Sequence, residues 1–164
     1  SKIVMKGIAR RGATGADFSG DDSGDAGFLV MMNEIIQDRP DVHRGWLEAE
    51  LDAQLFLADL SNASAVAKMA DDQTEGIERK ILWASLYQDE GGVNKLTLDF
   101  VFNNKVKTML KASTAFLAGK KKFGKRKDLR AESVWDDMAR KVMKDRGLSS
   151  PLGKIDGVPM SQYK

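Results

Sequence analysis

Residues 41–59 read DVHRGWLEAELDAQLFLAD, and this stretch decides the fold class. Asp41 is suited to begin a helix, and large apolar residues then recur at helical spacing. The inner face is assigned Trp46, Leu47, Leu51, Leu55 and Ala58, and the outer face Glu48, Glu50, Asp52 and Asp59. The pattern predicts an amphipathic helix that packs on other helices.

Further helices are expected on both sides of this stretch. Asp25 is a suitable N-cap for a helix over 26–38, whose apolar face holds Phe28, Met32, Ile35 and Ile36 and which Pro40 ends. Ser61 and Asn62 break the 41–59 helix, and SNASAVAKMA (61–70) continues as another helical piece. Asp72 and Glu75 have capping-box spacing, followed by a helical stripe of Ile77, Ile81, Leu82 and Leu86.

The last helix is indicated by its cap residues and its stripe. Asp128 or Ser133 begins it, and the apolar residues are Trp135, Met138, Val142 and Met143. Gly147 is suited to the left-handed residue after the helix, Leu148 to the accompanying apolar contact, and Pro151 prevents continuation.

Between these helices the period changes to two. Leu96, Leu98, Phe100 and Phe102 alternate with other residues, Asn103–Asn104 is a turn pair, and residues 105–108 can return as a partner strand. This favours a β-hairpin at about 95–114, with a helix through 95–117 as the alternative. The predicted fold is therefore mainly α, a helical core with one β-hairpin and irregular N- and C-terminal arms. The expected divisions are a Gly/Asp-rich arm (1–27), a helical domain with a basic insertion (28–146) and an irregular tail (147–164).

Composition excludes several classes of protein. The 164 residues include no cysteine, which excludes disulfides and thiolate chemistry, and a single histidine, which excludes multi-histidine metal sites. No apolar run approaches the roughly 20 residues that span a bilayer, and the N-terminal residues lack the apolar core of a signal peptide. We expect no membrane partner, no export by a signal peptide, and a location in the cytoplasm or a viral particle.

Charge is distributed unevenly along the chain. Residues 1–94 hold nine Lys/Arg and 17 Asp/Glu, whereas residues 95–164 hold 17 Lys/Arg and seven Asp/Glu. The two halves therefore carry net charges of −8 and +10, and residues 105–130 alone carry +9. Such a segment attracts polyanions or acidic protein surfaces.

Motifs that resemble catalytic or metal-binding sites are weak. Residues 119–126 (GKKKFGKR) match a phosphate-binding loop except that Arg126 replaces the hydroxyl residue that binds magnesium. The acidic residues of the arm, Asp17, Asp21, Asp22 and Asp25, lack the alternation of a calcium loop. His43 has no nucleophile beside it in the sequence, and Glu48 with Asp52 is typical of an exposed helix face. We predict no catalytic residue, no metal site and no cofactor.

The basic stretch is the candidate interaction site. It places an aromatic residue among cations that can meet phosphates or carboxylates; its members are Lys120, Lys121, Lys122, Phe123, Lys125, Arg126, Lys127 and Arg130. The leading prediction is a non-enzymatic structural subunit of a multi-protein assembly, such as a virion, connector or tail component of a bacteriophage. Its partners are other copies of itself or other assembly proteins, met through the arms and the oppositely charged halves. The alternative is a sequence-nonspecific DNA- or RNA-binding protein acting through residues 120–130.

Overall fold

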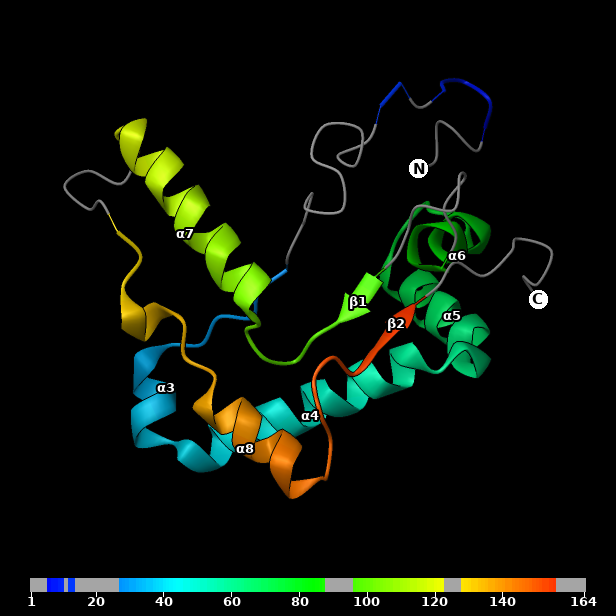
Figure 1. The fold of residues 1–164 in the computed structure, drawn as a ribbon. Coiled ribbons are helices and arrows are strands. Elements are labelled where there is room, and N and C mark those ends of the chain that lie inside the picture. Colours follow the sequence, from blue (N-terminus) through cyan, green and yellow to red (C-terminus); the bar gives the residue numbers. More distant parts are fainter. Residues whose placement is uncertain (1–5, 11, 14–26, 88–95, 123–127, 156–164) are drawn as a thin grey trace. The chain divides into compact units, whose positions relative to one another are not determined.

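The computed structural model describes residues 6–10, 12–13, 27–87, 96–122 and 128–155 (Figure 1). Six α-helices lie within these ranges: α3 (Asn33–Asp38), α4 (Pro40–Ala58), α5 (Ala63–Gln73), α6 (Arg79–Tyr87), α7 (Asn104–Gly119) and α8 (Asp137–Asp145). Two short strands, β1 (Leu96–Leu98) and β2 (Gly153–Ile155), and two 3₁₀ turns, Leu60–Asn62 and Ala131–Ser133, complete them. The prediction of a mainly helical fold is confirmed. None of the described helices is both long and apolar enough to cross a lipid bilayer.

The chain divides into two compact units. The first contains residues 1–14, 48–98 and 150–164, and the second contains residues 15–47 and 99–149. The division at 47/48 falls inside α4, which is one uninterrupted helix. The predicted boundaries after 27 and 146 remain predictions, and most of the expected N-terminal arm lies outside the described residues.

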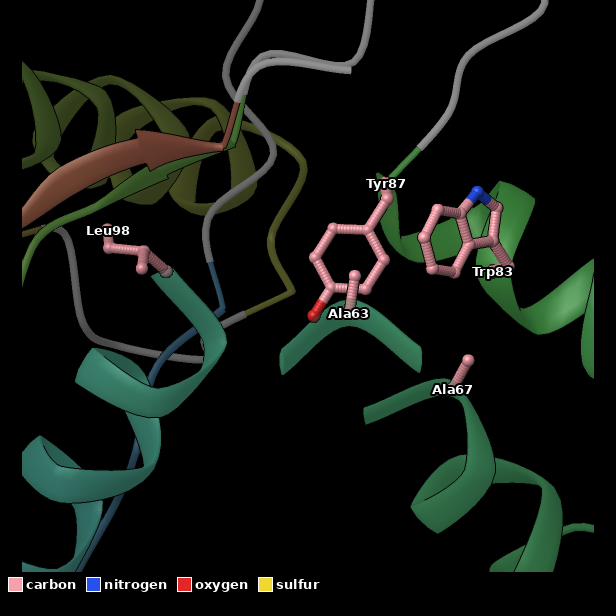
Figure 2. Packing of buried hydrophobic residues seen from close by; sticks show 5 residues of the cluster. All are labelled: Ala63, Ala67, Trp83, Tyr87 and Leu98. Atoms are coloured by element: carbon pink, nitrogen blue, oxygen red, sulfur yellow. The ribbon is translucent and has the colours of Figure 1, made fainter. Parts of the chain in front are cut away.

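The core of the first unit forms where α5 and α6 pack together. Tyr87 and Trp83 of α6 lie against Ala63 and Ala67 of α5, and Leu98 of β1 completes the buried cluster (Figure 2). The two small residues of α5 leave room for the rings of α6, whose centroids are 5.4 Å apart. The sequence pattern assigned Ile81, Leu82 and Leu86 to the inner stripe. Ile81 is buried as predicted, but Leu82 and Leu86 are only half-buried, and Trp83, Ala84 and Tyr87 are buried as well.

The predicted β-hairpin at 95–114 is wrong. Only residues 96–98 form a strand, and they pair antiparallel with residues 153–155, Leu98 opposite Gly153. Asn103 does not turn the chain back: its side-chain Oδ1 accepts a hydrogen bond of 2.9 Å from the backbone N–H of Val106 and so begins α7. Asparagine suits both a turn and a helix N-cap, and in this structure Asn103 is the N-cap of α7. The C-terminal tail correspondingly contributes a strand where irregular structure was expected.

Several helix starts also differ from the predicted ones. α3 begins at Asn33 because residues 27–32 are not helical, so the predicted helix over 26–38 is confirmed only in its second half. Asp72 lies inside α5 and is not the N-cap of α6. The α8 helix begins at Asp137, which leaves Trp135 outside it. Its end is as predicted, because Gly147 has φ 66° and Leu148 N–H donates to the Met143 carbonyl at 2.9 Å.

Candidate interaction site

The basic segment begins on α7, and the residues just before this helix are bound by a half-buried carboxylate. Asp136 accepts a hydrogen bond of 2.8 Å from the backbone N–H of Phe102 and two from Arg140, at 2.9 and 2.7 Å. Arg140 also donates to the Phe102 carbonyl at 3.1 Å. The hydrogen bond to Asp136 is the main reason that the pKa of Arg140 is raised. This clamp joins the residues just before α7 to the first turn of α8, within one unit.

The C-terminal end of α7 is built from three successive lysines. Lys121 N–H donates to the Ala118 carbonyl at 2.9 Å and Lys122 N–H to the Leu117 carbonyl at 3.0 Å. These two bonds form the helix-ending motif in which glycine usually takes the left-handed position, yet Lys121 holds it with φ 55°. Lys120 Nζ lies 5.6 Å from the centre of the Phe116 ring. Cations at this end of a helix are also favoured by its dipole.

Six basic residues of the segment 105–130 form no ion pair with a carboxylate in the described part of the chain. The ion pairs found there involve basic residues elsewhere, such as Arg44 with Asp145 at 2.8 Å and Arg79 with Asp71 at 3.3 Å. No such pair is found among the described residues for six members of the segment: Lys107, Lys111, Lys120, Lys121, Lys122 and Arg130. The structure therefore presents this charge to solvent or to a partner.

The predicted site residues are brought together only in part. Lys120, Lys121 and Lys122 are exposed and adjacent at the end of α7, and Arg130 is exposed before the 3₁₀ turn at 131–133. Phe123, Lys125, Arg126 and Lys127 lie outside the described residues. The clamp of Asp136 and Arg140 was not predicted from the sequence, although an acidic residue and an arginine at i,i+4 spacing in a helix favour an ion pair.

The weaker motifs gain no support as catalytic or metal sites. The residue that opens GKKKFGKR, Gly119, ends a helix, whereas a phosphate-binding loop follows a buried strand. Among the described residues there is no group of three or more metal-ligating side chains, and the arm aspartates lie outside them. His43 is 7% exposed, and its ring centroid lies 5.6 Å from that of Trp135. A histidine packed in this way, with Nδ1 unpartnered within the described residues, is a core residue.

Comparison with protein-family models, with curated proteins and with solved structures gives no match for this chain.

Proposed function

We propose that the chain is a non-enzymatic subunit of a multi-protein assembly that binds its neighbours through an apolar segment and oppositely charged surfaces. The observation that carries this proposal is the sequence FLVMM at residues 28–32, which precedes α3. Four of these five residues are exposed, and Val30 is 94% exposed. Contiguous exposed apolar residues are rare on soluble monomers and mark interaction surfaces.

The segment is anchored at one end and free to bind at the other. The Phe28 ring stacks on Phe102 of the same unit, with centroids 5.9 Å apart. Beyond it, Leu29, Val30 and Met32 are exposed, and Met32 itself has the extended dihedral angles φ −66° and ψ 141°. An extended apolar segment can lie in the groove or along the sheet edge of another chain, where each fully buried side chain contributes about 1.5–3 kcal/mol.

The mass of the protein in solution tests the proposal. We expect size-exclusion chromatography with light scattering to give an oligomer, and the double variant Val30→Ser, Met32→Ser to move it toward the monomer. The matched control is Met69→Ser, because Met69 is similarly exposed but lies on α5, outside the segment. A wild-type chain that stays monomeric at low and high salt would refute the proposal.

A second candidate, nucleic-acid binding, is favoured by the exposed lysines at the end of α7. Contacts made by Lys121 and Lys122 to phosphates would be independent of base sequence and would weaken steeply with salt. We expect the double variant Lys121→Glu, Lys122→Glu to lose binding to both DNA and RNA oligonucleotides. The matched control is Lys80→Glu, which changes an exposed lysine of α6 and should retain binding. Unchanged binding by the double variant would exclude this candidate, and a wild-type oligomer formed without nucleic acid would favour the first.

A further inference from the structure

The exposed face of α4 carries a stripe of apolar residues that is separate from its buried face. The residues of this stripe are all exposed and recur at i, i+4, i+7, i+11 and i+14. They are Val42, Trp46, Ala49, Ala53 and Phe56. We call this set the α4 seam. Trp46, which the sequence pattern assigned to the core, is 56% exposed, whereas Leu51 on the opposite side of the helix is fully buried. The α4 seam lies on one continuous helix. Its spacing is that of the apolar positions in coiled coils, where two helices pack side by side along their length.

The helix α7 has a stripe of the same spacing. Val106, Leu110, Ser113 and Leu117 recur at i, i+4, i+7 and i+11, and we call them the α7 seam. None of its residues is fully buried: Val106, Leu110 and Leu117 are half-buried, and Ser113 is exposed. Beside the seam, Phe116 is 63% exposed and lies with Ala112, Ser113 and Leu117 around a shallow, open depression in the surface of this helix. Aromatic side chains are the usual anchors of an interface, and the α4 seam offers Trp46 and Phe56.

The charges of the two helices are complementary. α4 holds four acidic residues and one arginine, a net charge of −3, whereas α7 holds three lysines and no acidic residue, a net charge of +3. Glu50 borders the α4 seam, and Lys107 borders the α7 seam. Pairing α4 with α4, or α7 with α7, would bring like charges together, so charge favours the mixed pair.

We infer that the α4 seam of one copy of this chain binds the α7 seam of a second copy. This inference rests on the proposed assembly function and adds a second contact between copies to the one proposed for residues 28–32. The contact joins two different surfaces, so a pair of copies keeps one free α7 seam on the first copy and one free α4 seam on the second, and the contact repeats into a ring or a filament. The α7 seam spans 11 residue steps, about 16 Å at the rise of an α-helix, which the α4 seam is long enough to match.

Cysteine cross-linking tests the inference directly, because the natural chain has no cysteine to interfere. The variants Ala53→Cys and Ser113→Cys, both at exposed seam positions, are prepared separately and mixed under mild oxidation. Paired seams place the two thiols at an effective concentration of order mM. At about 10 μM chain we therefore expect a disulfide-linked dimer about 100-fold faster than for unpaired surfaces.

The matched control is Ala115→Cys, which is also exposed on α7 but lies about 160° around the helix from Ser113. Mixed with Ala53→Cys, it should cross-link at the unpaired rate. The double variant Ala53→Cys, Ser113→Cys should form a ladder of linked chains, and adding Lys107→Glu and Lys111→Glu should slow its formation at least about tenfold.

Equal cross-linking rates for Ser113→Cys and Ala115→Cys would overturn the inference. So would a double variant that closes only a disulfide within one chain, since α4 would then pair with its own α7. Light scattering separates these results from failure of the proposed function, because an oligomer that does not cross-link at the seams retains the assembly and loses only this contact.

Discussion

Replacing Tyr87 by phenylalanine should stabilise the protein, although it removes an atom from the core. Tyr87 is 0% exposed, and its hydroxyl has no hydrogen-bond partner among the described residues. A buried polar group without a partner costs about 1–3 kcal/mol. The ring itself packs on Trp83, and phenylalanine keeps that contact. We expect Tyr87→Phe to raise the free energy of unfolding by about 1 kcal/mol, toward the lower end of that range because a small void replaces the oxygen.

The same side chain should make stability depend on pH in the alkaline range. Burial raises the pKa of Tyr87 from 10.0 to about 12. The unfolded chain therefore releases this proton at lower pH than the folded chain, and ionisation favours unfolding. The titration of Tyr87 therefore leaves the free energy of unfolding unchanged below pH 10 and lowers it as the pH rises toward about 12. Tyr87→Phe should remove this part of the alkaline loss.

Urea unfolding of the wild type and of Tyr87→Phe, followed by circular dichroism at neutral pH and above pH 10, provides the measurement. Tyr87→Ala is the comparison, because loss of the ring should cost about 3–5 kcal/mol. If Tyr87→Phe instead lowers the free energy of unfolding by 1 kcal/mol or more, the hydroxyl is hydrogen-bonded and the reasoning is refuted.

Three further substitutions test how α7 is held. Asn103→Ala should lower the free energy of unfolding by about 1 kcal/mol through loss of the helix cap, while Asn104→Ala, one residue later, should not; thermal unfolding measures both. Lys121→Gly should raise stability by about 1 kcal/mol because φ 55° is unfavourable for a lysine, and an unchanged melting temperature would contradict this. Asp136→Ala should lower the free energy of unfolding by about 2 kcal/mol. A double-mutant cycle with Arg140→Ala should show that the two side chains are energetically coupled. Strictly additive losses in the free energy of unfolding would mean that their interaction contributes nothing to stability.

The charge pattern and the helical class could be predicted from the sequence because both depend on local information. The period of residues 41–59 favours a helix, and the end of α8 follows from Gly147, whose missing side chain permits positive φ. The exposed state of Lys120, Lys121 and Lys122 follows in the same way, since a run of cations is costly to bury.

Tertiary structure decided what the local pattern left open. The alternation of residues 96–102 is typical of a strand, but a strand must be hydrogen-bonded to a second strand. The partner strand is residues 153–155, with Gly153 opposite Leu98, and it lies far along the chain. Asn103 could serve a turn or a helix cap, and the clamp at Asp136 fixes the residues before it. The sequence did not determine the position of Trp46, because large apolar residues occur on both sides of α4 and only packing shows that Leu51 is buried and Trp46 is not. The periodicity of a sequence predicts that one face of a helix is apolar. Whether that face is buried depends on which other segments of the folded chain pack against it.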